Sequence, residues 1–312
     1  MNIGVIGVGN MGRNHLRVYS ELRWVDRVYY YDSDPVKLTQ ISGKFEDCTP
    51  CESMQELLKK VDAVSVCVPT EKHFEVVKVC LEQGVNVLVE KPVVANLKEG
   101  EELLKIHSKS ELILGVGHIE RFNPIIREAT KLLDNPRYVE IKRHNPASAR
   151  VTTSSVIDDL MIHDIDIVWN IFFNGRANYE IHPYGDYNFC MVVAVFDKNI
   201  VFLSASRLSP RKIRTIYIEG DGFSVEGNFM DQEVYVYKKP SKYSVEDDKY
   251  IQENVIEKVL INKIEPLKEE LKQFVTSVKT GKPFPVTLEQ ALLNLKIVEV
   301  IKNKLQTSNS RC

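Results

Sequence analysis

MNIGVIGVGNMG at residues 1–12 decides the fold, because an apolar strand pattern runs directly into a glycine-rich turn. Gly7, Gly9 and Gly12 have the G-x-G-x-x-G spacing, with Asn10 and Met11 between the last two glycines. The first glycine permits a tight turn, the second lets a pyrophosphate approach the backbone, and the third brings the following helix close to the strand. Backbone N–H groups at the start of that helix point toward the phosphates. We therefore expect all five residues to bind a dinucleotide.

Asp32 ends the next expected strand, RVYYYD at residues 27–32, and follows Gly12 by 20 positions. At this position of a βαβ unit a carboxylate bonds the adenosine ribose hydroxyls. It would repel the 2′-phosphate of NADP, and the next residues, Ser33 and Asp34, supply no arginine. The pattern therefore predicts NAD as cofactor; the alternative is a glycine turn followed by a surface aspartate.

Strand and helix patterns alternate along about the first 118 residues, which predicts a parallel sheet. Nearly continuous apolar runs such as DAVSVCVP at 62–69 fit strands that helices cover on both faces. Beyond residue 120 two helical stretches precede a series of strand patterns between 178 and 238, which predicts an antiparallel sheet. A polar loop at 241–254, helices near 265–280 and 288–305 and a frayed tail complete the expected chain. We predict an α/β Rossmann domain over 1–120 and an α+β domain over 121–312.

Composition narrows the class of protein. A chain of 312 residues with 44% apolar residues has room for two domains with proper cores. A net charge of −2 with mixed signs gives no reason to expect nucleic acid or an anionic membrane as partner. The N-terminus lacks a signal-peptide pattern, and no apolar run approaches the roughly 20 residues of a membrane span. We expect a soluble, cytoplasmic protein. The single C-x-x-C, Cys48 and Cys51, has no second ligand pair for zinc.

SSVIDDLMIHDID at 154–166 places four aspartates around one histidine. On an α-helix Asp159 and His163 are four residues apart and share a face, with Asp166 on the same line. Asp158 has the spacing of a capping box with Ser155. A proton relay, a metal site and a structural pair all remain open on this spacing. Since no third histidine or cysteine is paired nearby in sequence, we expect no metal.

Three motifs together resemble the Gfo/Idh/MocA (glucose–fructose oxidoreductase/inositol dehydrogenase) family: VPTEKH at 68–73, VEKP at 89–92 and the D-x-x-x-H of 159–163. The resemblance implies a Rossmann domain, a second domain with a large, mostly antiparallel sheet, and an active site between them that oxidises a sugar or polyol alcohol. It implies that Lys91, Asp159 and His163 are catalytic and contact the substrate. It further implies that Pro69, Thr70 and His73 form the loop that passes the cofactor, and that Glu90 of the E-K-P tripeptide also binds the cofactor. Met161 stands where many members have glycine.

The implied roles agree with the chemistry of alcohol oxidation. A base must take the hydroxyl proton as hydride leaves carbon, and an imidazole has a suitable pKa. A neighbouring carboxylate can orient that imidazole, and a lysine near the reacting oxygen can stabilise alkoxide character. Hydride transfer to nicotinamide then needs no metal.

GVGHIERFNP, KRHNPASAR and VIDDLMIHDID resemble members that act on UDP-linked N-acetylhexosamines. The resemblance implies oxidation of the 3-hydroxyl of UDP-N-acetylglucosamine to a 3-keto sugar nucleotide, with a downstream aminotransferase as possible partner. We expect the substrate contacts to include Arg121, Asn123, Arg143 and Arg150, with the Arg211, Lys212 and Arg214 group as further cations for a diphosphate. Two alternatives remain: a dehydrogenase of a free sugar or polyol such as myo-inositol, and a non-catalytic NAD-binding regulator.

Aromatic residues recur at alternating spacings in the second half: Tyr217, Phe223, Tyr235 and Tyr237. A two-layer domain covers only one sheet face with its own helices, so the other face is available to a second subunit. The family resemblance implies the same. We predict a homodimer or homotetramer through the C-terminal sheet.

Overall fold

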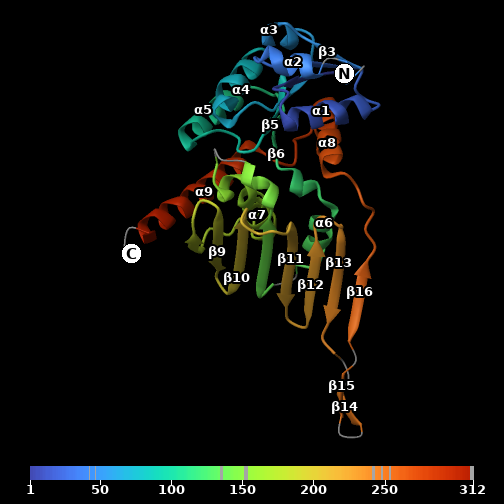
Figure 1. The fold of residues 1–312 in the computed structure, drawn as a ribbon, viewed down its shortest axis with the longest axis vertical. Helices are drawn as coiled ribbons and strands as arrows, with labels where there is room; N and C mark the ends of the chain where they lie inside the picture. Colours follow the sequence, from blue (N-terminus) through green and yellow to red (C-terminus); the bar gives the residue numbers. More distant parts are fainter. Residues whose placement is uncertain are drawn as a thin grey trace. The chain divides into compact units, whose positions relative to one another are not determined.

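The computed structural model describes residues 1–41, 43–45, 47–133, 136–150, 154–240, 243–246, 249–252 and 254–309. The chain divides into two compact units (Figure 1). The first unit contains Met1–Phe122 and Glu265–Lys296, and the second contains Asn123–Ile264 and Ile297–Cys312. This division differs from the predicted one, because residues 265–296 return to the first unit.

The first unit is built on a six-stranded sheet with the order β3-β2-β1-β4-β5-β6. Every pair in it is parallel. This is the strand order of a doubly wound dinucleotide-binding fold, and it confirms the predicted Rossmann domain. The strands are β1 (Asn2–Ile6), β2 (Arg27–Tyr31), β3 (Cys48–Pro50), β4 (Ala63–Val66), β5 (Asn86–Glu90) and β6 (Leu114–Gly117).

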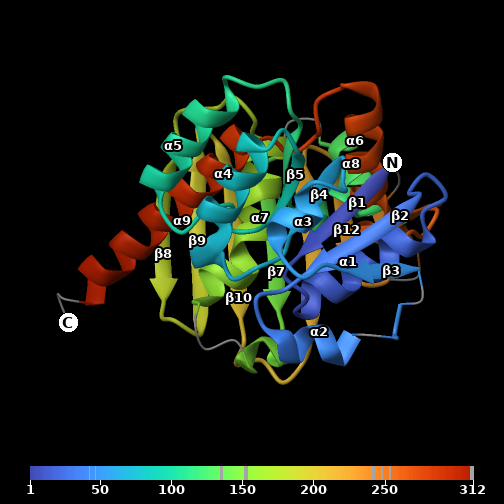
Figure 2. The ribbon, with the colours of Figure 1, turned by 90° about the horizontal axis from the view of Figure 1, so that it is seen from above.

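Helices bury the apolar strands of this sheet, so that Val5, Val64 and Val87 are fully inaccessible. Figure 2 shows α4 and α5 side by side. Gly84 and Gly281 follow α4 and α8 with φ of 73° and 68°, a left-handed conformation that suits glycine at a helix end. The helices are α1 (Asn10–Glu21), α2 (Pro35–Ile41), α3 (Met54–Leu58), α4 (His73–Glu82), α5 (Leu97–His107) and α8 (Pro266–Thr280), with 3₁₀ turns at Thr70–Lys72 and Ile119–Phe122.

The second unit is built on an eight-stranded sheet with the order β16-β13-β12-β11-β7-β10-β9-β8. Only β7 and β10 pair in parallel, and the other neighbours are antiparallel. The predicted mostly antiparallel sheet is therefore confirmed. Its strands are β7 (Tyr138–His144), β8 (Glu180–Gly185), β9 (Phe189–Phe196), β10 (Asn199–Ser206), β11 (Ile213–Gly220), β12 (Phe223–Asn228), β13 (Glu233–Lys238) and β16 (Val255–Val259).

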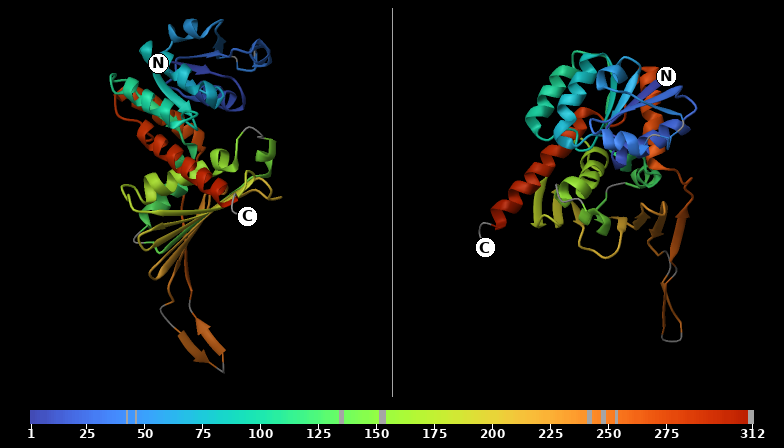
Figure 3. Two further views of the ribbon diagram at one scale, coloured as in Figure 1. Left: turned by 90° about the vertical axis from the view of Figure 1, so that its left-hand side faces the viewer. Right: turned by 45° about the horizontal axis from the view of Figure 1, so that its top comes forward.

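One face of the eight-stranded sheet carries helices (Figure 3). They are α6 (Pro124–Lys131) and a continuous helical segment over residues 157–172. The strands alternate accordingly: β7 has the pattern of partly exposed and buried residues expected when one face is covered. Tyr217 and Tyr235 belong to the less buried face, both opposite Glu226 on β12. Phe223 has the opposite parity to Glu226 along β12, so it faces the helix-covered side rather than the tyrosines.

The structure differs from the sequence prediction in three local features. The segment 157–172 is an α-helix only in α7 (Ile162–Ile167), with π-helical turns at Ile157–Met161 and Val168–Phe172. Part of the expected polar loop at 241–254 forms a small antiparallel pair, β14 (Tyr243–Glu246) and β15 (Lys249–Gln252). The last helix, α9, extends from Leu288 to Asn309 rather than ending near 305.

None of the described helices combines the length and apolar character that a membrane-spanning segment requires.

Candidate functional site

The glycine turn after β1 leaves room for a phosphate group only because it lacks side chains. Gly7 has φ of 90°, and a Cβ there would lie 2.7 Å from the backbone of Cys67 and Val68. A Cβ on Gly12 would lie 1.9 Å from the Gly7 carbonyl oxygen, whereas one on Gly9 would meet nothing within 4 Å. Gly9 therefore borders open space at the start of α1. A pyrophosphate fits there, against N–H groups that no described side chain caps.

Asp32 lies beside this turn and is only 8% exposed. Its Oδ2 accepts a hydrogen bond of 2.8 Å from the Val8 N–H, and its Oδ1 accepts one of 2.9 Å from the Asp34 N–H. The backbone thus fixes the carboxylate at the end of β2. A carboxylate has about four acceptor positions, so these two bonds leave capacity for ribose hydroxyls.

Lys91 follows directly on β5, and its peptide bond to Pro92 is cis. The preceding residue, Glu90, pairs through Oε1 with His15 Nε2 at 2.9 Å. Burial by itself would raise the pKa of Glu90, but the hydrogen bond from His15 and the electrostatic interactions with His15 and Lys91 outweigh it, so the pKa is lowered. Glu90 is therefore an anion at neutral pH. Its side chain remains 12% exposed.

His73 joins the two loops that carry the predicted cofactor residues. Its Nδ1 lies 2.8 Å from the Pro92 carbonyl oxygen and its Nε2 2.9 Å from that of Val68. The side chain is 1% exposed, and burial lowers its pKa against the effect of both hydrogen bonds. Pro69 and Thr70 lie on the loop between these anchors and remain accessible. His73 therefore supports the loop from inside. Of the predicted cofactor residues on this loop, only Pro69 and Thr70 are accessible to a cofactor.

In the second unit, Asp159 and His163 are both partly exposed on the segment 157–172. Asp159 accepts a hydrogen bond from Ser148 Oγ. Asp159 lies in the first π-helical turn and His163 in α7, and such π turns occur often at functional sites. Asp158 pairs with Ser155, as the capping-box spacing predicted, and also accepts a bond of 2.6 Å from Lys302 Nζ. Met161 is fully buried.

Arg143 is not placed as a diphosphate ligand. Its guanidinium forms an ion pair with Asp164, with Nε 2.9 Å and Nη2 2.7 Å from Oδ1. Both side chains are at most 1% exposed. Separating such a buried pair would leave one charge without compensation in a medium of low polarity. Arg143 is therefore a structural residue of the core and is not available to a diphosphate. Asp166 is also buried and accepts a bond of 3.0 Å from Asn170, so it does not extend the line of Asp159 and His163.

Two of the other predicted substrate contacts, Arg121 and Asn123, have structural partners. Arg121 Nη1 donates to Gln290 Oε1 at 2.7 Å and to the Pro285 carbonyl at 3.2 Å. Asn123 is 3% exposed, caps α6 and donates to the Phe229 carbonyl. The Arg150 side chain lies outside the described part of the chain. Arg211 and Lys212 are exposed. Apart from Arg143, these residues remain predicted substrate contacts.

Sequence reasoning missed two buried polar residues of the first unit, His15 and Glu270. His15 lies on the buried face of α1 between Gly12 and Tyr19, and Glu270 lies on that of α8 beside Leu271 and Phe274. The sequence could have revealed both, because each is a polar residue at a helix position where the spacing predicts an apolar, buried side chain. A polar side chain at such a position needs a hydrogen-bond or ion-pair partner inside the protein.

The chain is similar to known NAD-binding oxidoreductases. Residues 1–118 match the model of the Gfo/Idh/MocA oxidoreductase family, NAD-binding Rossmann fold. A UDP-N-acetylglucosamine 3-dehydrogenase from Acidithiobacillus ferrooxidans is 28% identical over 302 residues, which cover 91% of this chain and 90% of that protein. A myo-inositol 2-dehydrogenase from Thermotoga maritima is 26% identical over 354 residues, covering 99% and 98%.

Among solved structures, that of the Acidithiobacillus ferrooxidans enzyme superposes with a TM-score of 0.85 at 24% identity and covers 98% of each chain. The two-unit fold is therefore shared over nearly the whole length. We conclude that residues 1–118 match the NAD-binding Rossmann domain of the Gfo/Idh/MocA oxidoreductase family, and that the chain as a whole is similar to dehydrogenases.

Proposed function

We propose that the protein oxidises the 3-hydroxyl of UDP-N-acetylglucosamine with NAD, giving the 3-keto sugar nucleotide and NADH. The observation that carries this proposal is the similarity to a UDP-N-acetylglucosamine 3-dehydrogenase over about nine tenths of both chains. The chain also has the E-K-P and D-x-x-x-H residues on which the family resemblance rests.

In this proposal Lys91, Asp159 and His163 serve one hydroxyl. His163 takes the hydroxyl proton, because a neutral imidazole is a base of suitable strength near pH 7. Asp159 orients that imidazole and stabilises its cation. The Lys91 ammonium stabilises negative charge on the reacting oxygen as the C–H bond breaks. NAD, held by the glycine turn and Asp32, would supply the acceptor for the hydride that leaves carbon 3.

A free polyol such as myo-inositol is the second candidate substrate. It is supported by the myo-inositol 2-dehydrogenase that matches 99% of this chain. It would use the same three residues without any diphosphate contact, and the burial of Arg143 removes one argument for a diphosphate. The presence of all three reactive residues argues against a third candidate, a non-catalytic NAD-binding regulator.

The deciding experiment follows NADH absorbance with NAD and three substrates in parallel: UDP-N-acetylglucosamine, free N-acetylglucosamine and myo-inositol. Remote binding energy from the UDP group should raise kcat as well as lower KM, so the nucleotide sugar should react fastest. An arm that contains an aminotransferase acting on the ketone tests the proposed partner, because removing the ketone draws an unfavourable oxidation forward. Faster NADH formation with myo-inositol would replace this proposal by the second candidate.

We also propose a homodimer or homotetramer that forms through the less buried face of the eight-stranded sheet. Tyr217, Tyr235 and Tyr237 are partly exposed on that face, and aromatic side chains are enriched in protein interfaces. Light scattering at micromolar concentration tests this assembly, and a monomer would contradict it.

A further inference from the structure

A serine shortly after β7 bonds one of the proposed reactive residues. Ser148 Oγ donates a hydrogen bond to Oδ2 of Asp159, and both residues belong to the second unit. Ser148 is 3% exposed, whereas Asp159 is partly exposed. A hydroxyl that donates to an ionised carboxylate forms a charge-assisted bond, which is stronger than a bond between neutral groups. Ser148 therefore holds the Asp159 carboxylate from within the fold.

The turn that carries Ser148 is itself tied to the sheet. The Asn145 N–H donates to the Ser206 carbonyl oxygen at 2.8 Å, where the parallel pair of β7 and β10 ends. The Asn145 carbonyl oxygen accepts from the Ser148 N–H at 3.0 Å, and Asn145 Oδ1 accepts from the Ala147 N–H at 3.3 Å. Asparagine suits such a turn because its side chain can bond the backbone two residues further on. The backbone of Ser148 is thus fixed relative to β7 and β10.

A second contact ties the helical segment 157–172 to the same strand. Arg143 on β7 pairs with Asp164 in α7, and both side chains are buried. Arg143 precedes Ser148 in the chain, and its partner Asp164 follows Asp159, so the chain after β7 runs back along the helical segment. The ion pair fixes the segment on the sheet. The Ser148 bond then fixes one side chain of that segment.

Asp158, the neighbour of Asp159, has a serine partner of its own. Ser155 Oγ lies 2.6 Å from Asp158 Oδ2, and Ser155 is 6% exposed. Lys302 also pairs with Asp158, so the charge of this aspartate is compensated. The two serine–aspartate bonds join the same kinds of atoms, but only Asp159 belongs to the proposed reactive residues. Ser155 is therefore a matched control for Ser148.

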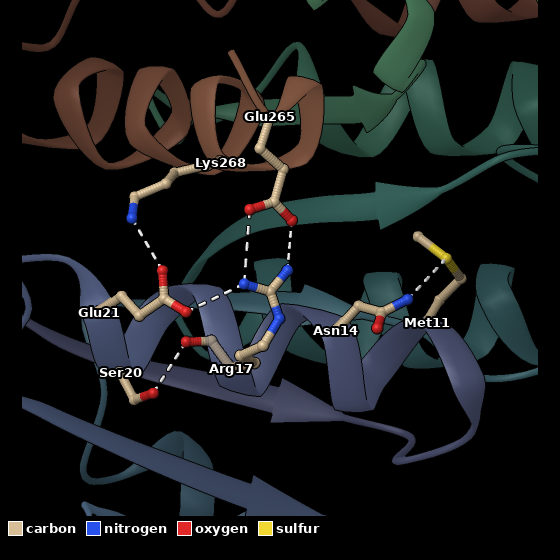
Figure 4. A network of polar contacts seen from close by, with 7 residues as sticks. All are labelled: Met11, Asn14, Arg17, Ser20, Glu21, Glu265 and Lys268. Atoms are coloured by element: carbon tan, nitrogen blue, oxygen red, sulfur yellow. Dashed lines mark hydrogen bonds and ion pairs between the residues drawn. The ribbon is translucent and has the colours of Figure 1, made fainter. Parts of the chain in front are cut away.

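Exposed ion pairs of the chain restrict their side chains less. In the first unit Arg17 of α1 pairs with Glu265, and Lys268 Nζ of α8 lies 2.8 Å from Glu21 Oε2 (Figure 4). These four side chains are between 39% and 44% exposed. Pairs that reach solvent contribute little to stability, because water and salt weaken the attraction between the charges. Ser148 is enclosed, so water competes less for its bond with Asp159.

We propose that Ser148 is a positioning residue that fixes the carboxylate of Asp159 for the reaction. Its hydroxyl bonds Oδ2 and so limits rotation of the aspartate side chain. A carboxylate has about four acceptor positions, so this bond leaves Asp159 able to orient an imidazole and to stabilise its cation. The role of Asp159 in turnover rests on the proposed function, whereas the Ser148 bond does not.

The variants Ser148→Thr and Ser148→Val separate the hydroxyl from the shape of the side chain. Their side chains have the same branched shape, but only threonine can donate to Asp159. Ser148→Val and Ser148→Ala should lower kcat by about tenfold or more, because a misplaced reactive group slows the chemical step. KM should change by less than about twofold, since binding of the alcohol is not the step affected. Ser148→Thr should retain a clearly higher kcat than Ser148→Val.

Steady-state kinetics with NAD and whichever of the three alcohols reacts fastest measures these effects. The control Ser155→Ala should keep kcat within about twofold of wild type. Equal kcat in Ser148→Thr and Ser148→Val would show that the hydroxyl does not matter and would overturn the positioning role. An equal loss of kcat in Ser155→Ala would overturn it too, because the start of the helical segment as a whole would then set turnover.

Denaturant unfolding tests the bond without any substrate. Ser148→Ala, Asp159→Ala and the double variant form a cycle. If the two side chains are bonded in solution, the factors by which the single changes alter the unfolding equilibrium constant should fail to multiply, by about fivefold or more. Factors that multiply would overturn the bond. NADH affinity, followed by nicotinamide fluorescence, should stay at the wild-type value, because every change lies outside the NAD-binding residues 1–118.

The kinetics of Asp159→Ala distinguish failure of this inference from failure of the proposed function. If Asp159→Ala slows turnover and Ser148→Ala does not, the proposed function stands and the positioning role is overturned. If Asp159→Ala turns over normally, Asp159 has no part in the reaction, and the proposed function must be changed at that residue. The positioning role then fails with it, and a coupled unfolding cycle would leave the Ser148 bond as a purely structural one.

Discussion

Two faces of the helical segment 157–172 carry the same kinds of side chain and differ in what surrounds them. Asp159 and His163 are partly exposed, and Asp159 has a serine partner. Asp164 is fully buried and bonds the buried Arg143. The residues are close in sequence, yet one face keeps access to solvent and the other is enclosed by the sheet.

The difference shows that packing, not residue type, separates a candidate reactive acid from a structural one. A carboxylate that accepts bonds from a buried arginine has its charge compensated in the ground state, and moving a proton to it would break that pair. An imidazole with access to solvent can exchange protons during a reaction cycle. The comparison predicts that changes on the buried face alter stability, and changes on the accessible face alter turnover.

The largest effect is expected on the buried face. Asp164→Ala should lower the free energy of unfolding by about 3–5 kcal/mol, because the Arg143 charge is left uncompensated in the core. Denaturant unfolding measures this loss. A double variant, Asp164→Leu with Arg143→Met, removes both charges and should recover much of the stability. If the single variant is as stable as wild type, the pair does not hold this face in the core.

On the accessible face, His163→Ala should lower kcat by about a hundredfold or more, the scale of general base catalysis. The free energy of unfolding should stay near the wild-type value because the side chain is partly exposed. Steady-state kinetics with UDP-N-acetylglucosamine and NAD, together with denaturant unfolding, measure both. His182→Ala, at an exposed histidine on β8, is the matched control. Normal turnover in His163→Ala would show that the accessible face, like the buried one, has only a structural role.

The smallest effect is expected at the edge of the segment. Lys302 pairs with Asp158 but is 39% exposed, and ion pairs that reach solvent contribute about 0–1 kcal/mol. Lys302→Ala should therefore lower the free energy of unfolding by less than about 1 kcal/mol, since Asp158 keeps its bonds with Ser155. A loss comparable to that of Asp164→Ala would mean that exposure does not distinguish these acids.

The sequence predicted most of the fold because the features that decide it are local. Gly7, Gly9 and Gly12 lie on one turn, and the helix predicted near 265–280 is α8, Pro266–Thr280. Residues 265–296 belong to the first unit, which could not be predicted. The apolar face of an amphipathic helix shows that the helix packs on something, but not on which sheet. The short β3 and α3 were missed for a similar reason, since three to five residues give too little periodicity to recognise.

The candidate site was predictable where a motif carried it and not where charge alone suggested it. Lys91, Asp159 and His163 were identified from motifs, and their roles remain proposals. Arg143 was chosen because it is a cation near the right motif, but its partner Asp164 lies 21 residues away in sequence and on a different element. His15 and Glu270 were passed over because a polar residue in an apolar stripe is weak evidence until its neighbours in space are known.

The division of the first unit between two stretches of chain has a consequence for its synthesis on the ribosome. Residues 1–122 emerge early, but α8, which packs on α1, begins only at Pro266. At about 5–20 residues per second, the intervening chain takes on the order of ten to thirty seconds to make. During that time α1 has no α8 to pack against. The first unit is therefore incomplete until residues 265–296 have been made, and a chain that ends before residue 266 should be less stable than one that includes α8.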